Sequence, residues 1–428
     1  MLGRASACLG AEATPWLRPL CIALSRWPAT VWSGHSPFSL ADALSGMPEF
    51  LAGFNAEGLP TPHVRRLLLR PSRMLPRPFA LANVPVPRLH TEADLGAWLG
   101  VSMSTLDALA GPAQRYREAT PTPRRIHTAA THHYRCLLLP KRRGGFRLIE
   151  EPLPLLKRVQ RHVLDELLNL VPTHEAAHGF VPGRNVASHA AMHANQAWVF
   201  SFDLTDFFAC IGSARVHALF QTLGYAPAVA ARLTTLCTTR TPAMVRERLR
   251  DEGMLDFLGA KRLAAAHLPQ GAPTSPALAN LCAFSLDLRL DGLARRFGAR
   301  YSRYADDLVI SGPECLGRQA HALRGWVTGI VEDEGFRIRR DKTRAMPSGG
   351  RQQVTGVVVN ERPNLARDEY DLLRARLHRL GNAGPVDGEL RAQCLGRIAW
   401  AAQFVAPARI AKLHRLFDRI QFNTKPSA

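Results

Sequence analysis

The sequence lacks paired cysteines and long apolar segments. Its eight cysteines are scattered singly, without a Cys-x-x-Cys pair. This argues against a zinc ribbon and a disulfide framework, and is typical of a reducing cytoplasm. The longest apolar run near the N-terminus, residues 20–24, is short and flanked by Arg18, Pro19 and Arg26, so we expect neither a secretory signal nor a membrane span. We therefore predict a cytoplasmic protein with no membrane partner.

Acidic residues are also scarce. The 428 residues include 35 Asp and Glu against 55 Lys and Arg, which gives a formal net charge of +20. Such an excess suits a polyanionic partner, because phosphate contacts and counterion release dominate nucleic-acid affinity. A soluble basic protein or an anionic-membrane binder would have the same composition, so charge alone leaves these classes open. With 46% hydrophobic residues, the chain can build two or three packed units.

Proline is concentrated at the start of the chain, where 12 of the 31 prolines precede residue 90. Such a density interrupts helices and central strands, so residues 1–88 are predicted to be a poorly structured extension of unknown role. Thr91 and Asp94 then resemble a capping box, and a glycine at 100 separates two short apolar stripes. This pattern predicts a pair of helices packed on the next domain, with a small DNA-binding module as the alternative.

Strands and helices alternate after the helical pair. Residues 133–140 and 146–149 flank a turn of basic residues and glycines, which predicts a β-hairpin with a basic tip. A helix is expected from about 155 to 170, and strands alternate with helices to about residue 360. The remainder has the pattern of three basic helices. The predicted fold class is α+β.

Three aspartates interrupt otherwise apolar segments. Asp203 ends the apolar run 198–202, where an unpaired charge would cost several kcal/mol, so a positive group should compensate it. Asp306 and Asp307 occupy the tip of a predicted strand–turn–strand, where like charges repel unless a cation lies between them. If the strands are neighbours, the carboxylates can share two Mg²⁺ ions, the metal that all-carboxylate sites favour. For Asp306 and Asp307 alone, ordinary turn chemistry is the alternative.

These residues resemble a known catalytic centre. The Tyr-Ala-Asp-Asp hairpin at 304–307, with Asp203 upstream, resembles that of reverse transcriptases. Residues 268–276, with Gln270 and Gly271, are similar to the family's segment under the templating base pair, and 335–343 resembles its next palm segment. The resemblance covers roughly residues 90–422 and implies a right-hand polymerase fold. Fingers and the helical pair would occupy 89–198, the palm 199–360, and a helical thumb 361–428.

Two further segments resemble the bacterial retron enzymes. Val354-Thr355-Gly356 matches their Val-Thr-Gly segment, and 189–193 resembles their Asn-Ala-x-x-His, with His189 where asparagine is usual. The resemblance implies a structured noncoding RNA as template and primer, and synthesis from the 2′-hydroxyl of a guanosine. It also implies a branched RNA–DNA product, a role in antiphage defence and an effector protein as a possible partner.

Three alternatives remain at this stage. One is another bacterial reverse transcriptase, of the group II intron or abortive-infection type, although an intron enzyme would be expected to carry a maturase extension after the thumb. An RNA-dependent RNA polymerase would favour Gly-Asp-Asp and a smaller residue than Phe208. The third, a non-catalytic nucleic-acid-binding protein built around residues 91–109, is disfavoured by the three intact aspartates.

The resemblance also assigns roles to individual residues. Asp203 and Asp306 would bind both Mg²⁺ ions, with Asp307 as a looser ligand, while the primer hydroxyl attacks the α-phosphate of a deoxynucleotide. Phe208 takes the steric-gate position against ribose, with Phe207 as the alternative gate. The remaining nucleotide contacts would be Lys141, Arg147, the backbone amides of Asp206 and Phe207, Gln270, Gly271, and Lys342 as a proton donor to pyrophosphate.

The predicted RNA contacts are His193, Val354, Thr355, Gly356 and, in the last helix, Arg409, Lys412, Arg415 and Arg419. For the basic helix, a solvated face is the alternative. His193 has a structural role as its alternative, and a zinc pair with His189 is a further one for which no third ligand is evident nearby.

Overall fold

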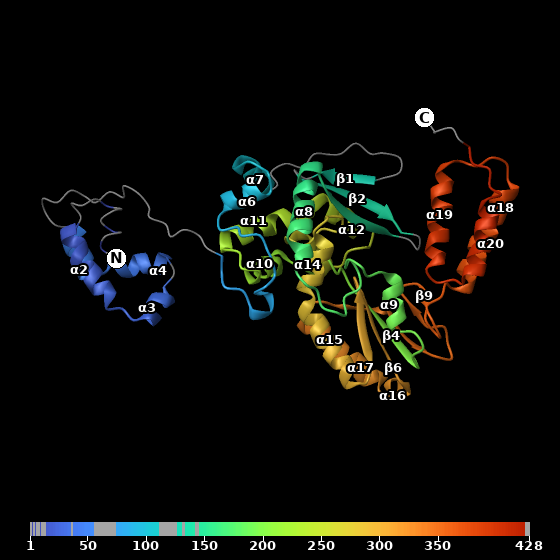
Figure 1. Cartoon of the computed structure of the whole chain (residues 1–428). Helices are drawn as coiled ribbons and strands as arrows, with labels where there is room; N and C mark the ends of the chain where they lie inside the picture. Colours follow the sequence, from blue (N-terminus) through green and yellow to red (C-terminus); the bar gives the residue numbers. More distant parts are fainter. Residues whose placement is uncertain are drawn as a thin grey trace. The chain divides into compact units, whose positions relative to one another are not determined.

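The computed structural model describes residues 14–35, 37–54, 74–110, 126–130, 133–141 and 145–423, together with residues 2, 5 and 9. The chain forms two compact units, Met1–Ser72 and Arg73–Ala428 (Figure 1). In the first unit, α2 (Thr14–Ser25) packs against α5 (Pro48–Phe54), with α3 (Ala29–Gly34) and α4 (Pro37–Ser45) between them in sequence.

The first unit contains more helical structure than we expect from the sequence, which predicts a poorly structured extension. Pro28 precedes α3, and Pro37 and Pro48 begin α4 and α5. At these positions the missing N–H of proline costs nothing, because the first helical N–H groups have no partner within the helix. Most of the prolines described here therefore mark where helices begin, while Pro19 lies inside α2.

Residues 74–89 pack with the second unit, although the sequence placed them with the extension. The Leu75 N–H donates to the Gly224 carbonyl at 2.6 Å, and Val86 and Leu89 are buried in the main core. After η2 (Phe79–Leu81), α6 (Glu92–Trp98) and α7 (Met103–Ala110) confirm the predicted pair, including the Thr91–Asp94 capping box. The pair packs on α11 (Pro227–Cys237), as the domain-packing interpretation expects.

The predicted fingers contain a three-stranded antiparallel sheet, β1 (Ile126–Ala130), β2 (Tyr134–Pro140) and β3 (Phe146–Pro152). The β2–β3 hairpin is as predicted, whereas β1 was not foreseen. Side chains of β2 pack on α12 (Ala243–Asp251) and α13 (Phe257–Ala264). The predicted long helix is α8 (Pro154–Glu166), which is followed by the short η3 (Leu168–Leu170).

The predicted palm is a four-stranded antiparallel sheet in the order β5-β6-β4-β7. Its strands are β4 (Trp198–Leu204), β5 (Arg300–Tyr304), β6 (Asp307–Gly312) and β7 (Ile338–Pro347). One face carries Phe200, Phe202 and Ile310, which join the main core with side chains of the covering helices. These helices are α10 (Ser213–Thr222), α14 (Ser275–Cys282), α15 (Phe284–Arg296), α16 (Glu314–Arg318) and α17 (Ala320–Asp333).

Fewer elements pack on the opposite face of the palm sheet. Because side chains alternate along a strand, Val199, Ser201 and Asp203 share this face of β4. Val199 is buried there with residues of α9 (Val186–Met192), β8 (Gln353–Val354) and β9 (Val357–Val358). Figure 1 shows α9 next to β9 on this side of the unit.

The C-terminal helices share a separate core. Leu373 and Leu377 of α18 (Arg367–Asn382) are buried against Ile398 of α19 (Glu389–Ala402) and Leu413 of α20 (Pro407–Phe417). These are the three helices predicted for the thumb (Figure 1). No helix among the described residues is long and apolar enough to cross a membrane.

Candidate active site

Strand pairing brings the three aspartates to one end of the palm sheet. Asp203 lies opposite Asp307 in the β4–β6 register, and the Leu204 N–H donates to the Asp306 carbonyl at 2.8 Å. Asp306 sits in the two-residue turn between β5 and β6, where Ala305 has a φ of +56°. The predicted hairpin is therefore present, and it places the Asp306 and Asp307 carboxyls beside the end of β4.

A close backbone approach supports this turn. Ala177 forms a parallel bridge with Arg303 of β5, and Gly179 follows against the turn. A Cβ on Gly179 would lie 2.6 Å from the Ala305 nitrogen, so only glycine allows this contact. Residues 177–179 thus buttress the hairpin that carries Asp306.

Two cations compensate Asp203, as its buried position required. Lys342 Nζ donates to Asp203 Oδ2 at 2.9 Å, and Arg339 Nε lies 3.7 Å from Oδ1. The Asp203 side chain is 18% exposed. Its Oδ1 is buried and has no hydrogen-bond partner within the described part of the chain. An acceptor that is only loosely paired in this way is available to a further cation.

The other two carboxyls repel one another. Burial and the charge of Asp203 raise the pKa of Asp306 above its usual value. Burial raises the pKa of Asp307 to about 7, where the hydrogen bond from Ser201 Oγ at 3.0 Å opposes the effect and the charges of Asp306 and Asp203 add to it. Clustered carboxyls with raised pKa values are typical of sites completed by a cation.

The donor set fits a hard divalent cation. Three carboxylates without histidine or cysteine provide the oxygen ligands that Mg²⁺ prefers. In this conformation Asp203 is engaged by Lys342 and Arg339, and Asp307 by Ser201. No three metal-ligating side chains are already arranged to hold an ion in the described segments. The carboxylates therefore suit the metal chemically, although Asp203 and Asp307 are engaged here with other side chains of the protein.

A row of cations lies beside the aspartates. Partial desolvation and the charges of Arg339, Arg147 and Lys342 lower the pKa of Lys141, while Asp206 opposes this shift. Lys141, Arg147 and Lys342, predicted from the sequence as nucleotide contacts, are thus brought together, and Arg339 joins them. Mutual repulsion of this kind is relieved when a polyanion binds, so the row suits a triphosphate.

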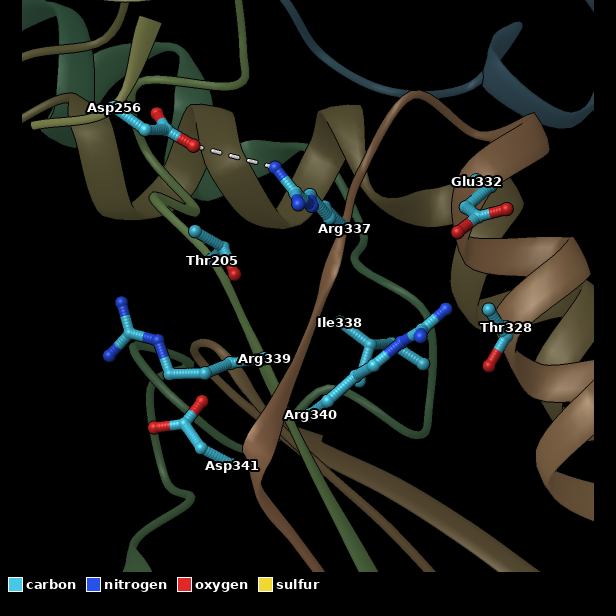
Figure 2. A pocket seen from close by; sticks show the side chains of 9 residues that line it. All are labelled: Thr205, Asp256, Thr328, Glu332, Arg337, Ile338, Arg339, Arg340 and Asp341. Atoms are coloured by element: carbon cyan, nitrogen blue, oxygen red, sulfur yellow. Dashed lines mark ion pairs between the residues drawn. The ribbon is translucent and has the colours of Figure 1, made fainter. Parts of the chain in front are cut away.

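A separate hollow of about 490 Å³ lies along β7 (Figure 2). Arg337, Arg339 and Arg340 line it together with acidic side chains, and Arg337 pairs with Asp256 at 3.5 Å. None of the three aspartates of the catalytic cluster lines it. Only Arg339 is shared with the cation row, so the hollow is adjacent to the candidate site and not part of it.

Phe207 and Phe208 occupy different environments. Phe207 is 4% exposed, stacks on Phe336 with ring centroids 5.7 Å apart, and packs in the main core. Phe208 is only partly buried, and its ring lies 6.2 Å from that of Phe180, which is exposed. The segment is a turn in which Asp206 has a φ of +51°. Phe208 nevertheless has the accessible ring that a gate needs.

Gln270 and Gly271 lie against the fingers. The Glu150 N–H of β3 donates to the Gln270 carbonyl at 2.9 Å, and a Cβ on Gly271 would lie 2.9 Å from the Glu150 carbonyl oxygen. Glu150 is itself buried between His267 and Thr241, at 3.0 and 2.7 Å. This network fixes the predicted nucleotide-binding segment to the sheet that leads to Lys141.

Burial contradicts two predicted RNA contacts. His193 and Val354 are fully buried, so neither side chain can touch a ligand in this structure. Both ring nitrogens of His193 are bonded to hydroxyls, Ser311 at 2.7 Å and Ser302 at 2.6 Å, which supports the structural role. Because no nitrogen of His193 is free, the zinc-pair alternative also fails.

The remaining predicted RNA contacts are accessible to different degrees. Thr355 is partly buried and Gly356 is exposed. On the thumb, α20 ends at Phe417, so one of the four basic residues lies beyond the helix, and another, Arg409, stacks over the Tyr370 ring at 3.8 Å. All four are exposed, namely Arg409, Lys412, Arg415 and Arg419.

Several residues that shape the site were not predicted from the sequence. Arg339 lies among other basic residues in the sequence, and the β4–β7 register sets it opposite Asp203. Arg262 lies 3.9 Å from Asp206. A signal for Asp287 was present, because an acid on the apolar face of a predicted helix requires a buried partner, which is Arg303.

The geometry agrees with comparisons to known proteins. Residues 139–359 match the family "Reverse transcriptase (RNA-dependent DNA polymerase)". The Retron Mx65 reverse transcriptase of Myxococcus xanthus is 38% identical over 80% of this chain and 74% of its own length. The Retron Mx162 enzyme of the same organism is 39% identical over 65% of this chain and 58% of its own. The Retron Ec86 reverse transcriptase of Escherichia coli is 28% identical over 71% of this chain and 82% of its own length. The chain belongs to the retron-type reverse transcriptases and is an RNA-directed DNA polymerase with a right-hand fold.

Proposed function

We propose that this enzyme extends a primer by two-magnesium nucleotidyl transfer at Asp203, Asp306 and Asp307. The observation that carries the proposal is the pairing of Asp203 with Asp307 across β4 and β6, beside a turn that presents Asp306 and next to a row of cations. When bound, two Mg²⁺ ions would activate the primer oxygen and stabilise the leaving oxygens of an in-line displacement.

Side chains of the protein bind the nucleotide and donate the proton. Lys141, Arg147 and Lys342 hold the triphosphate, and Arg339 adds a fourth positive charge near Asp203. The primer hydroxyl gives up its proton to water and attacks the α-phosphorus, a new P–O bond forms, and the bond to pyrophosphate breaks. Lys342, already within hydrogen-bond distance of the Asp203 carboxylate, gives a proton to the departing pyrophosphate. The backbone at Asp206 and Phe207 and the Gln270–Gly271 segment complete the nucleotide pocket.

The template is proposed to be a structured noncoding RNA. Kinship with retron reverse transcriptases supports priming from the 2′-hydroxyl of a guanosine in that RNA, which yields a branched RNA–DNA molecule. The exposed Lys412 and Arg415 of the thumb would follow its phosphate backbone, with Gly356 as a further contact. The same kinship supports work in the cytoplasm, an effector partner and a role in antiphage defence.

The test is the nucleic acid that copurifies with the protein from cells. One dominant RNA species, joined to DNA through a linkage that survives denaturation and is cleaved by a debranching enzyme, is expected for wild type. Asp306→Asn should retain the same RNA without the DNA. A broad RNA mixture that moderate salt removes would indicate electrostatic attraction alone and contradict the proposal.

A further inference from the structure

The turn at Val354-Thr355-Gly356 lies directly behind the catalytic carboxylates. Val354 and Val357 are fully buried against Val199 of β4 and Val309 of β6, the strands that carry Asp203 and Asp307. The backbone of Thr355 lies close enough to the Asp307 carboxyl to lower its pKa, and Ser201 Oγ donates to the same carboxyl at 3.0 Å. Asp307 is thus flanked by Ser201 of the neighbouring strand and by this turn.

Thr355 has an unfavourable backbone conformation for its residue type. Its φ is +48°, a left-handed value that a β-branched residue adopts only when its surroundings impose it. The surroundings include His189, whose Nδ1 lies 2.7 Å from the Thr355 hydroxyl. Burial, together with the nearby His193 and His178, lowers the pKa of His189 to about 2, so the ring is neutral and shares one hydrogen bond with the hydroxyl.

Helix α9 connects this contact to the hairpin of Asp306. An Asn185–Ser188 capping box fixes the start of the helix, and His193 at its end bonds Ser302 of β5 and Ser311 of β6. The His189 ring also lies 5.7 Å from the ring of Tyr304, the last residue of β5. The same helix therefore contacts the Thr355 turn and both strands of the hairpin.

We propose that Thr355 and His189 are positioning residues, which hold the Asp307 carboxylate in its working orientation through the backbone of the Val354-Thr355-Gly356 turn. The inference rests on the catalytic role proposed for Asp307. It gives the turn a function in the chemistry on any template, in addition to RNA contact by its exposed side. An asparagine at position 189 would place its side-chain amide near the position of Nδ1, so His189→Asn should preserve the bond to Thr355.

The experiment compares Thr355→Val and His189→Leu, which remove the bond, with Thr355→Ser and His189→Asn, which keep it. On oligo(dT)-primed poly(rA), a template without retron structure, the first pair should lose about ten- to a hundredfold in kcat, with little change in the KM for dTTP. Mn²⁺ binding, followed by the electron paramagnetic resonance signal of the free ion, should weaken in the same pair. The second pair should stay near wild type in both measurements.

The outcomes separate this inference from the proposed function. If Thr355→Val keeps its kcat and Mn²⁺ affinity but loses affinity for the copurified RNA, the turn is an RNA contact only and the inference is wrong. Should Thr355→Val fail to fold, Thr355→Ala carries the same expectation, and unchanged kcat in it would overturn the inference. Asp307→Asn is the reference, because full activity in that variant would instead remove the proposed catalytic site.

Discussion

Arg303 and Asp287 form a fully buried ion pair, with Arg303 Nη2 2.6 Å from Asp287 Oδ2, directly beneath the hairpin turn of the active site. A second guanidinium nitrogen, Nη1, donates to the Ala305 carbonyl at 3.2 Å, and Tyr301 donates to the same aspartate at 2.8 Å. The turn that presents Asp306 is thereby anchored to α15. Because the charges are buried and fully paired, the loss of one partner would expose the other to an apolar interior.

Asp287→Ala should therefore lower the free energy of unfolding by about 3–5 kcal/mol, since it leaves Arg303 buried without its counter-ion. The measurement is urea-induced unfolding of the full chain. A matched control lies on the same helix, where Arg295 pairs with Asp291 at 2.7 Å and is 75% exposed. Arg295→Ala should cost less than about 1 kcal/mol. Equal losses in the two variants would show that the buried pair does not anchor the hairpin.

The steric gate is tested by comparing two adjacent aromatic residues. Phe208→Ala should admit ribonucleotides, because its partly exposed ring is the group that would collide with a 2′-hydroxyl. Phe207→Ala should instead cost about 3–5 kcal/mol of stability, because Phe207 is buried in the main core. The measurement is the ratio of deoxy- to ribonucleotide incorporation efficiency, with thermal unfolding alongside. An unchanged ratio in an active Phe208→Ala enzyme would remove the gate from this position.

The Glu150–His267 pair should make stability depend on pH. Burial alone would lower the pKa of His267, but the hydrogen bond and charge of Glu150 raise it above its usual value. Both ring nitrogens face acceptors, the Glu150 carboxylate at 3.0 Å and the Ala265 carbonyl at 2.9 Å, so the protonated ring satisfies both. Because the pKa of His267 is raised in the folded state, the pair contributes its full stability below the unfolded-state pKa of about 6.5. This contribution is lost as pH rises through the folded-state pKa.

Glu150→Gln should therefore lower Tm most at about pH 5.5, and the difference from wild type should shrink as pH rises above 6.5. Glu151→Gln is the matched control, because Glu151 forms only a surface pair with Lys157 at 3.3 Å. Its effect should be small and independent of pH over that range. A Glu150→Gln difference that grows with pH would contradict the assignment of a protonated His267.

The catalytic aspartates could be predicted because each lies in a short sequence pattern that can be recognised without the fold. An aspartate that ends an apolar run and an aspartate pair in a turn are visible without the fold, and both lie where the sequence placed them. The strand order β5-β6-β4-β7 could not be derived from periodicity, because β4 pairs with β6 and β7 through residues more than a hundred positions apart. Arg339 escaped notice for this reason, since only the register with Asp203 distinguishes it from its basic neighbours.

Most of the other differences between the sequence-based predictions and the structure concern which side chains are buried. His193 and Val354 belong to segments with family hallmarks, and the sequence could not show that helix and turn pack inward on the palm sheet. Strand β1 is short and does not alternate between apolar and polar residues as a half-buried strand would. Its β structure therefore depends on pairing with β2, which its own sequence does not indicate. Proline density did not indicate the short helices within residues 1–88, because proline also begins helices.

The role of Asp306 in catalysis is tested by Asp306→Asn, measured as the rate of primer extension on a primed RNA with Mg²⁺ and deoxynucleotides. The substitution keeps the shape of the side chain and removes a charge that Asp203 repels, so Tm should stay at or above that of wild type. Asp341→Asn, an exposed acid on neighbouring β7, is the control and should extend the primer normally. We expect the folded Asp306→Asn enzyme to extend no primer. Extension at the wild-type rate would contradict the assignment of Asp306 as a metal-binding residue at the centre of catalysis.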